Sequence, residues 1–328
     1  MKINPSMTLR ALVAAGVCLA LPATGWAADA YPSKPIQVLV PLQVGTAADV
    51  ATRVILDKVA INMKQSFIIE NLPGVSGLLA AERISRAAPD GYTLGGITDS
   101  VLNYAANLTE RLNFDPVDGF EPISQMANIS WVLVANTSAD IRTVGDLIEK
   151  AKAKPGGIDY ATGGVGSPHH ISMELFAKDN GIKLNQVPYK GAAAATNDVA
   201  GGHVPVMFSA VSVVAPLLAD GRLHALAQPN EKRSGLLPDV PTFAEAGVKP
   251  FVFSTWLGLY APKGTPKAIV ERLNAEVAKA VADPAVRERL LALGLEPVRS
   301  TPAQLYDLTK AGYGRVGKAV KDAGIKPE

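Results

Sequence analysis

Residues 38–53 read VLVPLQVGTAADVATR, and this segment decides the fold. A short β-branched run ends at Pro41, a turn of small residues follows, and apolar residues at helical spacing continue from Val54 to Ile61. In a strand–turn–helix unit the first N–H groups of the helix are unpaired and lie at the positive end of the helix dipole, which suits an anion. Gly45–Asp49 is therefore either an anion-binding turn or a plain tight turn that needs glycine for backbone freedom.

The first 30 residues have the pattern of a secretory signal peptide. Lys2 and Arg10 give a positive start, and Ala11–Leu21 is apolar but shorter than the ~20 residues of a membrane span. Small residues then lead to an expected cleavage after Ala27 or Ala30. The alternative is an N-terminal membrane anchor. We expect a soluble, exported protein, most simply in a periplasm.

The composition of the exported chain argues against nucleic-acid binding and sets how the fold must be stabilised. Without residues 1–30 the chain keeps 30 basic and 29 acidic residues, and it loses Cys18, its one cysteine. A chain of near-neutral charge with no basic run is not typical of nucleic-acid binding. A chain of 298 residues without disulfides must be stabilised by its own core.

Short apolar runs alternate with longer amphipathic runs along the chain, which predicts parallel βαβ units and an α/β fold. Strands are expected at 36–40, 67–70, 92–97, 131–135, 160–161, 184–187, 204–208 and 251–259. Helices are expected at 49–64, 77–86, 143–154, 215–220, 266–283, 284–293 and 302–322, with two more after the turns at 162–170 and 189–191. The pattern restarts at Trp131, and a loop-rich stretch at 232–247 suits a return crossing. We therefore predict two lobes, 31–130 plus 252–328 and 131–251, with crossings near Ser130 and Val252.

Two groups of residues at strand ends are expected to line one cleft, since ligands of α/β sheets bind beyond the carboxyl ends of strands. They are the Gly45 turn, which follows the first strand, and Thr98-Asp99-Ser100, which follows the third. A second glycine-rich turn, Thr162–His170, lacks the spacing of a nucleotide-binding motif. A role for Asp49 at the start of the helix fits better than a role as an anion contact. Its carboxylate would repel an anion, and it can instead pair with N–H groups of the loop.

His169 and His170 invite a metal or catalytic interpretation. No further ligand stands at a matching short spacing for zinc, so no metal site and no cofactor are expected. A Ser167–His170 nucleophile pair lacks the G-x-S-x-G turn and an orienting acid. Ligand hydrogen-bond donors or helix caps are the more economical interpretation. Trp131 and Trp256 suit a core, and for Tyr189 a core and a cleft position are both open.

Motifs along the whole mature length resemble those of the solute receptors of tripartite tricarboxylate transporters, the Bug-type periplasmic binding proteins. They are YPSKPI (31–36), ENLPG (70–74), AAPDGYTL (87–94), FDP (114–116), KAKPG (152–156), VPYKG (187–191), LPDVPT (237–242), APKGTP (261–266) and AGIK (323–326). The resemblance implies a two-lobed type II periplasmic binding-protein fold and a non-enzymatic function. It also implies an organic carboxylate as ligand and a membrane permease of one large and one small subunit as partner. We expect a monomer with no nucleic-acid partner.

By resemblance, the first-lobe ligand loop follows Pro41 and the second is Thr162–His170. The first loop departs from the family pattern, because Thr46, Ala47 and Ala48 stand where two glycines and a threonine are usual. Ser209 stands where an aspartate is common, which favours a ligand without an amino group, and Val101 and Leu102 would suit its apolar body. The candidate ligand contacts are Gly45, Thr46, Ala47, Ala48, Asp49, Thr98, Asp99, Thr162, Gly163, Gly166, Ser167, His170, Tyr189 and Ser209. Two alternatives remain: a hydrolase that uses Ser167 and His170, or a receptor that signals to a sensor kinase when loaded.

Overall fold

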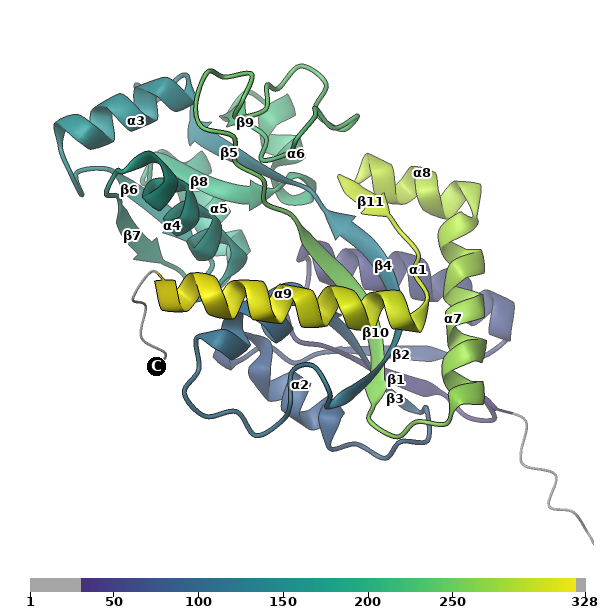
Figure 1. Cartoon of the computed structure of the whole chain (residues 1–328). Helices are drawn as coiled ribbons and strands as arrows, with labels where there is room; N and C mark the ends of the chain where they lie inside the picture. Colours follow the sequence, from purple (N-terminus) through teal and green to yellow (C-terminus); the bar gives the residue numbers. More distant parts are fainter. Residues whose placement is uncertain (1–30, 323–328) are drawn as a thin grey trace, which may run out of the picture.

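Two β-sheets, each flanked by helices, form the two lobes of the molecule (Figure 1). The computed structural model describes residues 31–322, so the predicted signal peptide lies outside the described residues. The first sheet has the strand order β11-β4-β10-β3-β1-β2 and the second β7-β6-β8-β5-β9. The two-lobed α/β architecture expected from the sequence is confirmed.

The strands of the first sheet come from both ends of the chain. They are β1 (Ile36–Val40), β2 (Phe67–Asn71), β3 (Thr93–Thr98), β4 (Phe120–Ile129), β10 (Thr255–Pro262) and β11 (Leu295–Pro297). The strands of the second sheet come from one continuous segment. They are β5 (Trp131–Asn136), β6 (Asp159–Thr162), β7 (Asn185–Pro188), β8 (Val206–Ala210) and β9 (Leu223–Ala227).

The helices cover the faces of these two sheets. They are α1 (Ala47–Met63), α2 (Leu78–Ser85), α3 (Val144–Ala153), α4 (Pro168–Asn180), α5 (Ala192–Ala200), α6 (Val211–Ala219), α7 (Lys267–Ala282), α8 (Pro284–Ala292) and α9 (Pro302–Asp322), with the short turns η1 (Val75–Gly77) and η2 (Ser100–Ala105). Helix α9 is the long yellow helix that crosses the first lobe, where it packs against η2 and β4 (Figure 1). Within residues 31–322 no helix combines the length and hydropathy of a membrane span.

Several helices begin where a local capping signal predicts it. Thr143 accepts a hydrogen bond from the backbone N–H of Asp146, whose carboxylate accepts one from the N–H of Thr143 in return, a complete capping box. Ser167 caps α4 and Pro168 follows at the first helical position.

Two chain crossings join the lobes. Ser130 is the one residue between β4 and β5, and the return passes from Phe253 to β10. The indole N–H of Trp131 donates to the Thr255 hydroxyl at 2.9 Å, which ties the starts of β5 and β10 together. The segment before β10 belongs to the second lobe, since Phe243 and Phe251 pack on Phe176 and Phe208. The division at residues 130/131 and 251/252 stays a prediction.

Three strands and the two short helical turns η1 and η2 were not predicted. The sequence pattern did not predict β4, β9 or β11, and β10 begins at Thr255 instead of the predicted residue 251. The sheets are mixed, because β10 runs antiparallel to both β3 and β4 and β5 runs antiparallel to β8 and β9. The stretch after β3 forms the π-helical turn η2.

Candidate ligand-binding cleft

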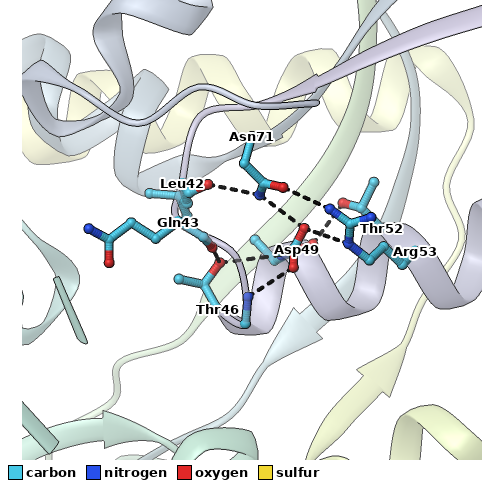
Figure 2. A network of polar contacts seen from close by, with 9 residues as sticks. Leu42, Gln43, Thr46, Asp49, Thr52, Arg53 and Asn71 are labelled. Atoms are coloured by element: carbon cyan, nitrogen blue, oxygen red, sulfur yellow. Dashed lines mark hydrogen bonds and ion pairs between the residues drawn. The ribbon is translucent and has the colours of Figure 1, made fainter. Parts of the chain in front are cut away.

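The turn before α1 is held by a polar network centred on Asp49 (Figure 2). Its carboxylate is 2 % exposed and accepts hydrogen bonds from the Gly45 N–H at 2.9 Å, the Asn71 amide at 2.9 Å and the Arg53 guanidinium at 2.9 Å. The Asn71 amide also donates to the carbonyl of Leu42. Asp49 therefore points into its own loop and fixes it, as the sequence suggested for this residue.

Thr46 completes this turn as the N-cap of α1. Its hydroxyl donates to the Gln43 carbonyl at 2.9 Å and accepts from the Asp49 N–H at 3.4 Å. Gly45 has φ +81°, a conformation that side chains rarely adopt, so its glycine is explained by the turn itself. The N–H groups of Ala47 and Ala48 belong to the first turn of the helix, which has no intrahelical partners.

The second glycine-rich turn, before α4, is held in the same way. The Ser167 hydroxyl donates to the Gly164 carbonyl at 2.7 Å and accepts from the His170 backbone N–H at 3.4 Å. The His170 Nδ1 accepts from the Gly166 N–H at 3.2 Å. The side chains of Ser167 and His170 are thus both used to build the turn.

The two turns face each other across a cavity of about 480 Å³ between the lobes. Its lining is mostly apolar or backbone: Pro41, Leu42, Gln43, Thr46, Ala47, Ala48, Pro73, Gly74, Ser76, Gly77, Thr98, Ser100, Ile129, Trp131, Gly163, Gly164, Val165, Ser167, Pro168, His169, Lys190, Gly191, Ala192, Ala210 and Val213. A concave site of this size with few polar side chains suits a small organic ligand.

Five helices begin at this cavity, namely α1, α2, α4, α5 and α6. Thr46 and Ser167 cap α1 and α4, whereas α2, α5 and α6 have no side-chain cap. The first N–H of α2, at Leu78, donates to the Val75 carbonyl and that of α6, at Val211, to the Ser130 carbonyl, whereas within residues 31–322 the first N–H of α5, at Ala192, has no partner. The positive ends of all five helix dipoles lie at the same cavity. The cavity wall is therefore built to receive a negative charge.

The side-chain charges of the lining agree with this polarity. Among the described residues, Lys190 is the only charged side chain in the lining and no carboxylate is present there. Burial lowers the pKa of His169 to about 4, so its ring is neutral at pH 7.

Six of the predicted contact residues lie in the cavity wall. They are Thr46, Ala47, Ala48, Thr98, Gly163 and Ser167. The structure thus brings together both predicted loops and the end of β3, from three separate parts of the chain.

Eight predicted contacts are not in the wall: Gly45, Asp49, Asp99, Thr162, Gly166, His170, Tyr189 and Ser209. Gly45, Asp49, Gly166 and His170 hold the turns, as described above. The Thr162 hydroxyl accepts from the Gln186 amide at 2.9 Å and from the Gly164 N–H.

The other three of these residues are hydrogen-bonded or buried outside the cavity wall. Asp99 is buried toward the crossing and accepts from the Trp256 N–H at 3.3 Å, and Tyr189 donates its hydroxyl proton to Asp198. Ser209 is fully buried in β8. Val101 and Leu102, expected against an apolar ligand, are fully buried in the core instead.

Several wall residues were not among the predicted contacts, above all Gln43, Ser76, His169 and Lys190, although Gln43 and His169 lie in the two predicted loops. Gln43 and Ser76 bridge the lobes: the Gln43 amide donates to the Lys190 carbonyl at 2.8 Å, and the Ser76 hydroxyl donates to the Val165 carbonyl at 3.2 Å. Nothing in the local pattern marks these residues, since their partners are about ninety or more positions away in sequence.

Comparison with known proteins agrees with the geometry. The sequence model of one protein family, the tripartite tricarboxylate transporter family receptor, matches residues 51–325. This chain belongs to that receptor family. The receptor is 33% identical to Protein BugT of Bordetella pertussis over 300 residues, which cover 91% of this chain and 92% of BugT.

Solved structures give the same assignment. The receptor resembles the periplasmic binding protein BugD with a TM-score of 0.84 and 29% identity, over 91% of this chain and 100% of BugD. It also resembles a Rhodopseudomonas palustris protein solved with adipate, with a TM-score of 0.86 and 32% identity over 91% of this chain and 100% of that chain. These neighbours confirm a Bug-type receptor with the two-lobed periplasmic binding-protein fold.

Proposed function

We propose that this chain is a periplasmic receptor that binds an organic carboxylate and delivers it to a membrane permease of one large and one small subunit. One observation carries the proposal: five helices begin at one cavity in which, among the described residues, no side-chain carboxylate is present. Unpaired N–H donors and the positive ends of these helix dipoles stabilise an anion there without a cationic cluster. The adipate bound to the Rhodopseudomonas palustris neighbour is a ligand of this class.

The lining also narrows the class of carboxylate. An amino acid needs an acceptor for its ammonium group, and a carboxylate of the protein is the strongest such acceptor. Within residues 31–322 no side-chain carboxylate lies in the cavity wall. The wall has apolar surface from Pro41, Ile129, Trp131 and Val213. A plain dicarboxylate or an aromatic acid therefore fits better than an amino acid.

Capture follows from the two-lobed construction. An anion that enters the open cleft is held by the starts of α1 and α4, and the lobes close over it by rotation at the crossings near Ser130 and Val252. The bridges from Gln43 and Ser76 then form at the mouth. The family relationship supports the permease as the partner and the periplasm as the location.

A receptor of this kind performs no chemistry on its ligand. The Ser167 hydroxyl donates to a backbone carbonyl, and His170 Nδ1 accepts from a backbone N–H. Neither group is arranged as a nucleophile and base, because a catalytic pair needs the imidazole to accept the serine proton.

A thermal-shift screen of the exported chain tests the proposal, since specific binding raises the melting temperature by mass action. The screen contains succinate, glutarate, adipate, citrate, benzoate, glutamate and aspartate. A rise with at least one plain acid that exceeds the rise with either amino acid supports the proposal. No rise with any acid, or a preference for the amino acids, contradicts it.

The hydrolase alternative has its own control. Ester turnover by the exported chain is compared with turnover by Ser167→Ala. A receptor shows no turnover in either protein, whereas turnover that disappears in the variant would identify an enzyme.

A further inference from the structure

His169 occupies a position in the cavity wall that its role as a helix residue does not explain. It is the second residue of α4, its side chain is 7 % exposed, and its ring packs edge-on against Trp131 with centroids 5.1 Å apart. Its Nδ1 atom is buried and has no hydrogen-bond partner within residues 31–322. Buried polar atoms are nearly always paired, so an unpaired ring nitrogen on a residue of the cavity wall is available to a ligand group that reaches it.

Gly163 leaves space beside this nitrogen. Its backbone does not have the positive φ that would require glycine, unlike Gly164 and Gly166 in the same turn. A Cβ atom at residue 163 would lie 3.3 Å from His169 Nδ1 and 3.1 Å from the backbone nitrogen of Ala192. The missing side chain therefore leaves both nitrogen atoms free of a contact from residue 163, and a ligand atom can approach the space between them past the Gly163 Cα.

Ala192 supplies the donor on the other side of this space. It is the first residue of the nine-residue helix α5, and its N-cap Gly191 provides no side-chain hydrogen bond. An N–H group can only donate, so the group that fills the space must be an acceptor, and the positive end of the α5 dipole favours an anionic one.

We propose that Gly163, His169 and Ala192 form the subsite for a second carboxylate of the ligand, so that His169 selects dicarboxylates over monocarboxylates. The first carboxylate is held by the starts of α1 and α4, as in the proposed function, and the inference of a second subsite rests on that function. A carboxylate oxygen in the subsite accepts from the Ala192 N–H and selects the Nδ1–H tautomer of the neutral His169 ring. Trp131 holds the plane of that ring.

The test compares each diacid with its monoamide, a pair of nearly equal size that differs in one charge. Succinate, glutarate and adipate are titrated by calorimetry against succinamate, glutaramate and adipamate, with wild type and His169→Leu. The subsite predicts that at least one diacid binds about tenfold or more tightly than its monoamide, and that His169→Leu removes most of this ratio. His169→Asn, which keeps an N–H near the position of Nδ1, should restore part of it.

Several controls keep the outcome clear. His203→Leu removes an exposed histidine outside the cavity wall and should leave the ratio unchanged. Gly163→Ala fills the space directly and should lower diacid affinity more than monoamide affinity, which keeps the test available if His169→Leu fails to fold. Nitrogen NMR of labelled histidine should show His169 change toward the Nδ1–H tautomer when the diacid binds.

Other outcomes separate this inference from the proposed function. Equal binding of diacids and monoamides, or equal losses in His169→Leu, overturns the subsite while the carboxylate receptor stands. A preference for benzoate with no binding of any diacid does the same. No binding of any carboxylate overturns both.

Discussion

The side-chain amide of Gln43 donates a hydrogen bond to the backbone carbonyl of Lys190, 2.8 Å away across the mouth of the cavity. Gln43 belongs to the turn before α1, and Lys190 to the turn before α5, so the contact joins the two lobes. Gly191 leaves room for the amide, since a Cβ at that position would collide with the Gln43 side chain. The lobes are therefore held in contact at the ligand loops themselves, and ligand release requires this bond to open.

We expect Gln43→Ala to release ligand faster. One exposed hydrogen bond contributes about 1 kcal/mol, which corresponds to about a fivefold change in the dissociation rate constant. Stopped-flow fluorescence measures that rate with the best acid of the thermal-shift screen. Gln65→Ala, beyond the far end of α1, is the matched control and should leave the rate unchanged. Equal rates for wild type and Gln43→Ala would show that the bridge does not hold the closed form.

Asp49→Asn should destabilise the chain and weaken binding together. The amide cannot accept from Gly45, Arg53 and Asn71 as the carboxylate does, so we expect a loss of about 2 kcal/mol in the free energy of unfolding and a weaker affinity through a looser turn. Urea unfolding and calorimetry measure the two effects. Asp57→Asn, on the exposed face of the same helix, should change neither. A variant with normal affinity would mean that the network does not position the ligand loop.

Asp99 should make the stability fall as the pH rises. Burial raises the pKa of Asp99 to about 8, against the lowering effects of the Trp256 and Ser100 N–H groups and of Arg315. Between pH 4 and 8 the unfolded chain has lost this proton while the folded chain keeps it, so stability decreases with increasing pH in this window. From pH 6.5 to 8 the loss is about 2 kcal/mol at most. Urea unfolding of Asp99→Asn should lack this loss, and identical slopes in both proteins would contradict the buried, protonated state.

His169 should have the opposite dependence at lower pH. Its pKa of about 4 lies below the usual value for histidine, so between pH 4 and 6.5 the unfolded chain binds more protons and stability rises with pH. In wild type the slopes of Asp99 and His169 oppose each other in this window. Asp99→Asn should therefore show a steeper rise of stability with pH than wild type between pH 4 and 6.5. His169→Leu should show a shallower one, since the lowered pKa values of His170 and His224 still contribute a rise. A slope in His169→Leu equal to that of wild type would contradict the buried, neutral state of His169.

Thr143→Ala separates stability from binding. It removes the capping box at the start of α3, outside the cavity wall, and should cost about 1 kcal/mol of unfolding free energy with no change in affinity. A weaker affinity in this variant would indicate that binding depends on global stability, and the effect of Asp49→Asn would then need correction for it.

Local patterns sufficed for most of the helices and for the strands with strongly apolar runs, but α6 begins at Val211 and not at the predicted residue 215. β1 and the caps at Thr143 and Ser167 follow from neighbouring residues alone, and the motifs of the family placed both ligand loops. β4 was missed because Pro122 and the polar residues Ser124 and Gln125 break any alternation in it. Its strand character comes from β10 and β11, whose partner residues lie more than 120 positions away in sequence.

Only part of the cavity wall could be predicted, for a related reason. A helix start can be read from the sequence, so Thr46 and Ser167 were found together with their turns. Whether a polar side chain then faces the cavity or its own loop depends on packing, which is why His170, a candidate ligand contact, is used by its own turn instead. For Asp49 the expected repulsion of an anion already indicated a role in fixing the loop, and its carboxylate does accept from the Gly45 N–H. His169 and Lys190 enter the wall only through the approach of α4 and α5.

The central claim, that this chain is a receptor for a plain carboxylate, is tested most directly by calorimetry. The exported chain is unfolded, dialysed free of bound small molecules and refolded, and then titrated with the best acid of the thermal-shift screen and with its fully amidated analogue. We predict one binding site per chain for the acid, with micromolar or tighter affinity, and at least a hundredfold weaker binding of the uncharged amide. Equal affinity for acid and amide, or no binding of either, would contradict a cavity built to receive a carboxylate.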